Sequence, residues 1–510
     1  MKKINKYYII LLFLVLGSIT SCDKGFDEMN VNPVDLTSVD PAFQLNYSII
    51  SSASTYSNLQ YETIIVKQMI NPFSGVGAAA QYNQDNRSVT SANWTRYYRS
   101  VIKDLTEITT DLKDNTSRSN LYNMARIWKA YSIMVVTDTY GEVPFTQSGK
   151  GYIDGTVLPK YDTQEFIYTE ILKELESAAS SLDATKPIEN RDIIYAGNVE
   201  SWKRLANSLL LRGAMRLSKI NTSLATKYVT SAVAGGLMRS NVDNAYIQHD
   251  ANYPNPVGIQ LNGGQSFFFY AAKDFITYLK STNDPRLTSI SVRYVGAKSG
   301  TDQKESIANR TAQAQIGMPI GYDNTTISEA VAADNLVSMY EYSQLDRTRM
   351  GGSTAPSFFV TYAQTQLLLA EAVYRGWAQG DASALYSNGI RAHMSQLATY
   401  GASTAIPLAN IDAYIQANPY NAAKALEIIN TQYWIASFLN GPEAFANFRR
   451  TGYPVLVPNP YPGSDLKTEA FIRRLTYPDS ELNVNSANVQ EAISRQGLDI
   501  LDTRVWWDVK

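Results

Sequence analysis

Apolar residues recur at every third or fourth position along several long segments of the chain, which is the spacing of amphipathic helices. One apolar stripe runs from Trp94 to Leu105 and a second from Leu121 to Tyr131. Asp162 and Glu165 have the spacing of a capping box and predict the start of another helix. Further stripes occupy residues 167–182, 200–217, 362–373 and 426–436. We therefore expect a mainly α-helical fold.

The helical pattern fails between about residues 241 and 352, where Gly, Asn and Pro recur. The segments NYPNPVGIQLNGGQ and IGMPIGYDN are typical of this region. A loop region of that length inside a compact body is usually functional. The flanking stripes have the length of the helical hairpins in tetratricopeptide repeats, but no 34-residue period is legible. The pattern thus predicts a helical scaffold with long irregular loops.

The first 21 residues have the pattern of a bacterial lipoprotein signal peptide. Three lysines precede ten apolar residues, 7–16, a run too short to span a bilayer as a helix. Ile19-Thr20-Ser21-Cys22 then matches a lipobox, although an ordinary secretory signal with an incidental cysteine is the alternative. We predict that residues 1–21 are removed and that Cys22 carries the lipid anchor. The polar residues 22–41 would form a tether, and residues 42–510 a single domain.

Composition excludes several classes of function. The 45 Lys and Arg are balanced by 47 Asp and Glu, so no basic surface for nucleic acid is expected. One Cys and two His cannot build a Cys/His zinc site, and a disulfide within the chain is impossible. We therefore expect no metal site and no cofactor.

Candidate catalytic motifs are weak. The run Gly75–Ala80 matches G-x-G-x-x-A, but Asn71-Pro72-Phe73 precedes it in place of a strand. His249 and His393 have no recognisable partner motif and are expected to be surface or satisfied polar residues. Asp138 and Glu142 could form the carboxylate pair of a helical surface glycosidase. Their setting, VTDTYGEVP, favours turn and capping roles instead. We predict no catalytic residues, with the glycosidase as the alternative function.

Seven runs follow one another in fixed order behind the lipobox. They are DTYGEVPF (138–145), PKYDTQEFIY (159–168), IYAGNVESWKRLANSLLLRGAMRL (194–217), DPRL (284–287), TYAQTQLLLAEAVYRG (361–376), YWIASFLNGPEAFANFRRTGYPVL (433–456) and RRLTYPDSELNVN (473–485). Together these runs resemble the SusD/RagB family of nutrient-binding outer-membrane lipoproteins. The resemblance spans roughly residues 22–510, and its subtype resembles the SusD-like branch.

This resemblance implies a mainly α fold with a tetratricopeptide-like scaffold, irregular loops that carry the ligand surface, and no catalysis. It also implies a SusC-like TonB-dependent transporter as partner, over which the lipoprotein sits at the cell surface. The outer-membrane location is expected from the family resemblance and not from the lipobox, because Asp23 directly after Cys22 favours inner-membrane retention in some bacteria. The cargo would be an oligosaccharide, or another nutrient oligomer such as a peptide. A purely structural partner of the transporter, which binds no oligomer, is a further alternative.

Aromatic residues outside the helical stripes are the candidate ligand contacts, because aromatic faces can stack on sugar rings. They lie in residues 71–86 and in the irregular region, where Gly and Asn recur. The predicted ligand-binding residues are Phe73, Tyr82, Tyr253, Phe267, Tyr270, Tyr294 and Tyr322.

Overall fold

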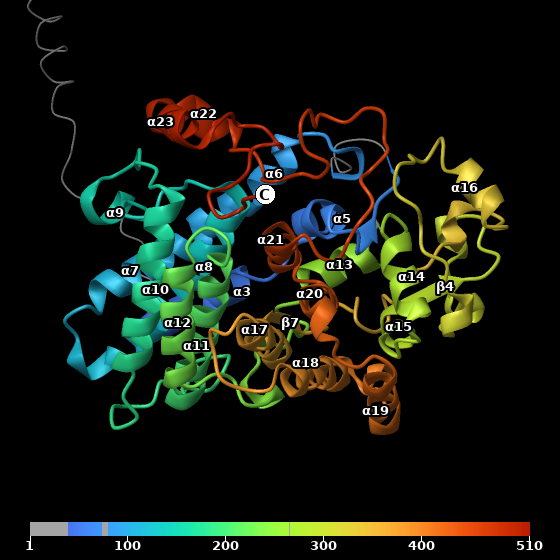
Figure 1. Cartoon of the computed structure of the whole chain (residues 1–510). Coiled ribbons are helices and arrows are strands. Elements are labelled where there is room, and N and C mark those ends of the chain that lie inside the picture. Colours follow the sequence, from blue (N-terminus) through green and yellow to red (C-terminus); the bar gives the residue numbers. More distant parts are fainter. Residues whose placement is uncertain (1–38, 74–79, 265) are drawn as a thin grey trace, which may run out of the picture. The chain divides into compact units, whose positions relative to one another are not determined.

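The computed structural model describes residues 39–73, 80–264 and 266–510. Residues 41–510 fold as one compact unit. Helices dominate this unit, which confirms the expected mainly α-helical fold (Figure 1). The predicted signal peptide, Cys22 and nearly all of the predicted tether lie outside the described residues, as does most of Gly75–Ala80.

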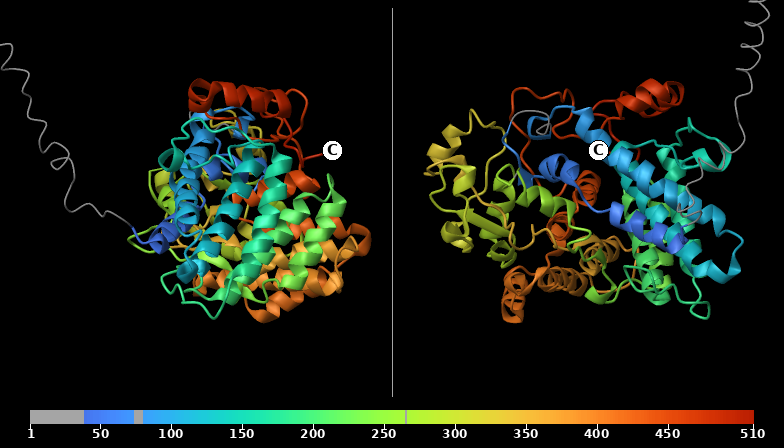
Figure 2. Two further views of the ribbon diagram at one scale, coloured as in Figure 1. Left: turned by 90° about the vertical axis from the view of Figure 1, so that its left-hand side faces the viewer. Right: turned by 180° about the vertical axis from the view of Figure 1, so that it is seen from behind.

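The first half of the unit is a set of helices whose longest members are α8, α10, α11 and α12. These four pack against one another and run side by side in Figures 1 and 2. Asn198 caps the start of α11, because its side chain accepts a hydrogen bond from the Ser201 amide at 3.0 Å. The helices are α3 (Pro41–Ser51), α4 (Tyr56–Gln60), α5 (Glu62–Ile65), α6 (Arg87–Arg96), α7 (Lys103–Asp111), α8 (Ser119–Tyr140), α9 (Gly151–Asp154), α10 (Gln164–Ser181), α11 (Val199–Arg216) and α12 (Thr222–Gly235).

The last third of the chain returns to helices, and α17 packs against both α18 and α20. Helical hairpins such as α11–α12 and α17–α18 agree with the tetratricopeptide-like scaffold that was expected. The helices are α17 (Tyr362–Tyr374), α18 (Ala382–Gln396), α19 (Leu408–Ala417), α20 (Ala425–Ala436), α21 (Gly441–Thr451), α22 (Asp479–Val484) and α23 (Ser486–Gln496).

Short elements fill the region between these two helical parts, which the sequence pattern left irregular. In its described residues the α-helices are α13 (Pro256–Asn262), α14 (Lys273–Ser281), α15 (Arg286–Ile290) and α16 (Ser328–Ala333). Small antiparallel sheets add to them. The sheets are β1 (Met69–Ile70) with β3 (Tyr270–Ala271), β2 (Ala245–Ile247) with β7 (Ser357–Val360), and β4 (Ser291–Tyr294) between β5 (Ala308–Asn309) and β6 (Gln344–Leu345). The pairing of β1 with β3 joins the region to the first helical part.

Two local predictions differ from the structure. The predicted capping box of Asp162 is wrong, because Thr163 is the residue before α10 and its side chain accepts from the Phe166 amide. The Asp162 carboxylate instead accepts hydrogen bonds from the Phe145 and Thr146 amides at 3.1 and 2.8 Å. The stripe from Trp94 to Leu105 is helical throughout, but Tyr97–Ile102 forms a π-helical segment between α6 and α7.

Buried ion pairs hold the long helices together. Asp138 of α8 pairs with Arg216 of α11 at 3.2 Å, and Arg216 also contacts Glu443 of α21 at 2.7 Å. Arg450, near the end of α21, pairs with Glu371 of α17 at 2.7 Å. All five side chains are almost completely buried, so each charge depends on its partner for compensation.

Candidate functional site

An aromatic cluster forms where two segments far apart in the sequence meet. The antiparallel register of β1 and β3 pairs Ile70 with Tyr270. Continuing that register by three residues places Phe73 opposite Phe267. Tyr340 reaches the same place from a short 3₁₀ turn, in which the Ser338 side chain accepts from the Tyr340 amide at 3.1 Å. We call Phe73, Phe267, Phe268 and Tyr340 the aromatic cluster.

The rings of the aromatic cluster contact one another in both stacked and edge-on geometry. Phe73 stacks on Phe268 with centroids 4.5 Å apart, and its centroid lies 5.8 Å from that of Phe267. The Phe267 ring lies 6.0 Å from the Tyr340 ring. All four side chains are half-buried. Part of each side chain therefore stays accessible to solvent, and an accessible aromatic ring can stack against a sugar ring.

Polar groups adjoin the aromatic cluster. The side-chain amide of Gln303 donates to the Tyr340 carbonyl at 2.9 Å, and its oxygen accepts from Arg347 at 3.4 Å. The Arg347 guanidinium lies 5.3 Å from the centre of the Tyr294 ring. A side chain at Gly300 would collide with Phe267, since a β-carbon there would come within 2.5 Å of its ring. The site thus combines aromatic faces with a guanidinium and an amide.

A second aromatic contact joins Tyr82, which follows Phe73 in the same segment, to Tyr461. Tyr82 packs on Tyr461 with centroids 4.4 Å apart, and its hydroxyl donates to the Pro72 carbonyl at 2.9 Å. The neighbouring Gln81 donates to the Tyr322 carbonyl at 3.2 Å. Segments around residues 82, 322 and 461 are thereby joined next to the start of the aromatic cluster.

The seven predicted ligand residues fall into four groups. Phe73 and Phe267 lie together in the aromatic cluster, and Tyr322 is half-buried beside Gln81. Tyr253 is 61% exposed, and no contact joins it to the aromatic cluster in the described part of the chain. The remaining three predicted residues are buried, namely Tyr82, Tyr270 and Tyr294.

Three aromatic residues of this surface were missed in the sequence, Phe268, Tyr340 and Tyr461. Phe268 follows Phe267 directly, and Tyr461 lies in the segment PNPYPG. Both carry the signal used for the predicted residues, an aromatic side chain outside the helical stripes. Tyr340 lies in SMYEYS, where sequence does not distinguish a turn from a strand.

Asp138 and Glu142, the carboxylates of the alternative glycosidase, both make structural ion pairs with residues of other elements. Asp138 accepts from the Trp507 indole at 2.9 Å and from the Tyr168 hydroxyl, besides its contact with Arg216. Burial raises the pKa of Asp138 above its ordinary value, while Arg216 opposes that change. Glu142 pairs with Arg495 at 2.7 Å. The favoured turn and capping roles are therefore wrong for both side chains, which join separate elements through ion pairs.

Both histidines are buried and hydrogen-bonded, as expected of satisfied polar residues. The His249 ring contacts the Tyr253 carbonyl and the Ser357 hydroxyl, each at 2.9 Å. Since the carbonyl can only accept, Nδ1 carries the proton and Nε2 accepts from Ser357. Burial lowers the pKa of His249. His393 contacts Arg286 at 3.0 Å.

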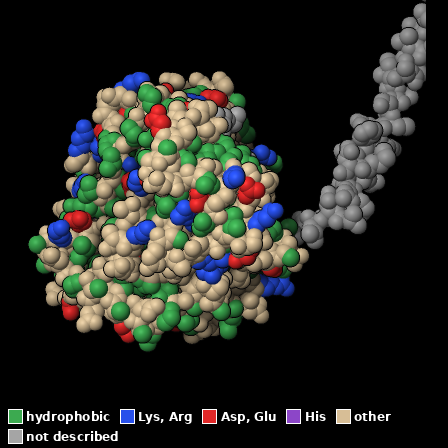
Figure 3. All heavy atoms as spheres, turned by 90° about the vertical axis from the view of Figure 1, so that its right-hand side faces the viewer, with side chains coloured by type: hydrophobic (Ala, Val, Ile, Leu, Met, Phe, Trp, Pro, Cys, Tyr) green, Lys and Arg blue, Asp and Glu red, His purple; other side chains and the backbone are tan. Residues whose placement is uncertain are grey.

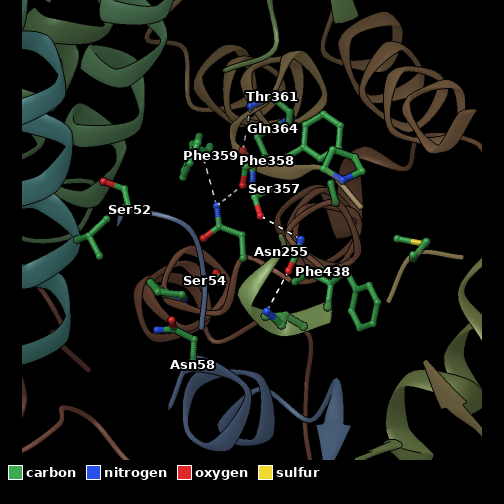
Figure 4. A pocket seen from close by; sticks show the side chains of 18 of the residues that line it. Ser52, Ser54, Asn58, Asn255, Ser357, Phe358, Phe359, Thr361, Gln364 and Phe438 are labelled. Carbon is green, nitrogen blue, oxygen red and sulfur yellow. Dashed lines mark hydrogen bonds between the residues drawn. The ribbon is translucent and has the colours of Figure 1, made fainter. Parts of the chain in front are cut away.

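A small cavity lies in the interior, between the ends of α17 and α21 and strand β7 (Figure 4). Its volume is about 40 Å³, enough for two or three waters and far below the ~300 Å³ of typical ligand pockets. The side chains of Asn440 and Gln364 that line it are hydrogen-bonded to Phe359 and Thr361 respectively. This cavity cannot take a sugar ring.

A larger groove of about 420 Å³ lies between α10, α11 and α12. Its lining includes Glu176, Lys203 and Asn207, with small residues between them. No aromatic ring is among the lining residues, so this groove offers no stacking surface. The aromatic cluster remains the better candidate for oligomer binding.

The charge pattern and the described helices place further limits on the site. On the face shown in Figure 3, basic and acidic side chains are interspersed among apolar ones. The described residues contain no group of three or more His, Cys, Asp or Glu that could hold a metal ion. Within the same ranges, no helix is long and apolar enough to cross a bilayer.

Comparisons with known proteins identify the family of this chain. A SusD-like family described as "Starch-binding associating with outer membrane" matches residues 33–478. A solved chitin-binding protein is 29% identical, with a TM-score of 0.81 over 92% of this chain and 100% of that one. A chitin-binding SusD homologue from Flavobacterium johnsoniae is 26% identical, with a TM-score of 0.74 over 92% and 98%. A SusD homologue from Bacteroides uniformis is 25% identical, with a TM-score of 0.76 over 92% and 99%. No curated protein sequence matches. Because the family match covers most of the chain, this protein belongs to the SusD-like family.

Proposed function

We propose that this protein captures oligosaccharides at the cell surface and that the aromatic cluster forms the binding surface. The observation that carries the proposal is the meeting of Phe73, Phe267, Phe268 and Tyr340 as half-buried rings beside Gln303 and Arg347. A pyranose ring has one apolar face that stacks on such rings, while its hydroxyl groups pair with amide and guanidinium donors.

Chitin-type oligomers are the first cargo to test, because two similar solved proteins bear chitin-binding names. An exposed aromatic surface holds a few sugar units at a time. We therefore expect affinity between micromolar and millimolar, about −8 to −4 kcal/mol, which captures the oligomer and still releases it.

The N-terminus and the delivery step complete the proposal. Cys22 would carry the lipid that holds the protein at the outer membrane, and the tether of residues 22–41 would join the body to it. The captured oligomer would pass to a SusC-like TonB-dependent transporter. The expected observation is a large barrel protein that co-purifies in near-stoichiometric amount from native membranes.

The test is calorimetric titration of the wild type and of Phe267→Ala/Tyr340→Ala with chitin and maltose oligomers. Loss of both rings should weaken binding of the cognate oligomer at least ten-fold and leave the fold intact, since neither side chain is fully buried. The matched control is Tyr374→Ala, an exposed tyrosine on α17, which should bind like the wild type. Unchanged affinity in the double variant would place the binding surface elsewhere. Release of reducing sugar by the wild type would instead favour the glycosidase.

A further inference from the structure

Helix α3, the first element of the compact unit, leaves two aromatic side chains in solvent. Phe43 and Tyr47 are each 51% exposed and lie one turn apart on the same face. The opposite face is buried through Leu45 and Ile49. Helix α3 therefore packs against the core through its other face, and the two neighbouring exposed rings form the start of an apolar surface patch, a feature that often marks an interaction site.

The segment 186–193 extends this surface. The Asn46 side chain donates to the Arg191 carbonyl at 2.7 Å and accepts from the Ile193 amide at 3.2 Å. The Arg191 guanidinium lies 4.9 Å from the centre of the Phe43 ring, and Ile193 is 40% exposed. We call Phe43, Tyr47, Arg191 and Ile193 the α3 patch.

In the segment 186–193 the acidic side chains are buried or ion-paired, whereas the basic side chains are exposed. The carboxylate of Asp192 is turned inward, where it accepts from the Trp202 indole at 2.7 Å. Glu189 pairs with Arg118 at 2.6 Å. Arg191 and Lys186 are exposed. The surface therefore offers cations next to aromatic rings, the combination that favours the boundary between lipid headgroups and acyl chains.

The position of α3 in the chain indicates what covers the α3 patch. Only residues 23–40 separate α3 from Cys22, and 18 residues span at most about 65 Å. If Cys22 is lipidated, α3 is the element held closest to the bilayer along the chain, at high effective concentration. Two aromatic rings that project from one helix can also enter the headgroup region of a lipid bilayer.

We propose that the α3 patch docks on the lipid bilayer, with the rings of Phe43 and Tyr47 at headgroup depth and Arg191 on lipid phosphate. This contact rests on the anchor of the proposed function and adds to it a defined orientation of the body. The lipid on Cys22 would fix only the end of the tether, so a second contact of this kind would orient the body on the membrane. The aromatic cluster takes no part in the contact.

The test uses the lipid-free body, residues 39–510, because residues 41–510 form a compact unit with its own core. Sucrose-loaded vesicles of phosphatidylethanolamine and phosphatidylglycerol at 3:1 are sedimented with the wild type and with Phe43→Ser/Tyr47→Ser. The bound fraction should fall at least five-fold in the double variant. Arg191→Gln should halve it on these vesicles and leave it unchanged on neutral ones. Tyr374→Ser, which removes an exposed tyrosine of α17, should sediment like the wild type.

Three results would overturn the docking. They are absence of wild-type protein from the vesicle pellet, equal sedimentation of the double variant, and a wild-type dimer that the double variant abolishes while vesicles bind neither. Each single variant, Phe43→Ser and Tyr47→Ser, repeats the test should the double variant unfold. Titration of the same preparations with chitin oligomers separates the two proposals. Vesicle binding without oligomer binding contradicts only the glycan site, and the reverse contradicts only the docking.

Discussion

Replacement of Glu371 by Gln should destabilise the helical scaffold by about 3–5 kcal/mol. Glu371 is completely buried and accepts from Arg450 twice, at 2.7 Å each, from Arg375 at 2.8 Å and from Asn430 at 3.1 Å. Removing the charge leaves the Arg450 guanidinium buried without a carboxylate partner. Breaking a buried pair on one side costs about that amount, whereas the exposed pair of Lys173 and Glu170 should contribute under 1 kcal/mol.

The pKa of Glu371 shows how the stability contributed by this ion pair depends on pH. Burial alone would raise it, but Arg450 and Arg375 hold it at about 2, against an ordinary value of 4.5. The folded chain therefore releases this proton more readily than the unfolded chain. The resulting stabilisation, about 3 kcal/mol, is fully present above about pH 5 and is lost as the pH falls towards 2.

Urea unfolding followed by circular dichroism at pH 7 and at pH 3 checks both statements. At pH 7 Glu371→Gln should unfold at clearly lower urea than the wild type, and Glu170→Gln should not. Between pH 7 and pH 3 the wild type should lose more stability than Glu371→Gln, because the variant lacks the titrating group. Equal stability of the wild type and Glu371→Gln at pH 7 would refute the assignment of this ion pair as a major support of α17 and α21.

Two further substitutions separate the core and the anchor from the ligand surface. Trp202→Ala should destabilise the chain by about 3–5 kcal/mol, because Trp202 is fully buried and the cavity it leaves lies among long helices. Thermal unfolding measures this loss, and a stability close to that of the wild type would contradict the packing. Cys22→Ala should abolish lipid attachment without loss of the fold, as followed by metabolic labelling with a fatty-acid analogue; label retained on the variant would rule out the lipobox.

The helical scaffold could be predicted from the sequence because its signal is repeated many times. The stripe in residues 200–217 became α11 with bounds that differ by one residue at each end, and Trp202 lies in the core as the stripe requires. The start of α10 was harder to predict, since both Asp162 and Thr163 can cap a helix. The choice between them depends on the Phe145 and Thr146 amides, which come from a distant segment.

The candidate ligand surface was less predictable because an aromatic residue outside a helical stripe can still be part of the core. Tyr270 and Tyr294 each belong to a very short strand, and both are buried. Sequence periodicity cannot recognise strands of two to four residues. Asp138 and Glu142 illustrate the same difficulty, since Arg216 and Arg495, which pair with them, are 78 and 353 residues away in the sequence.

The location of the aromatic cluster outside the helices has a physical reason. A ring on a helical stripe is drawn into the contact between helices, as Trp94 is, and loses its solvent-facing side. A ring that stacks on a sugar must keep one face in water and still be held on the other. The two-residue ladder of β1 and β3 brings the two segments together, and beyond its end the rings of Phe73 and Phe267 lie 5.8 Å apart, each still half-buried.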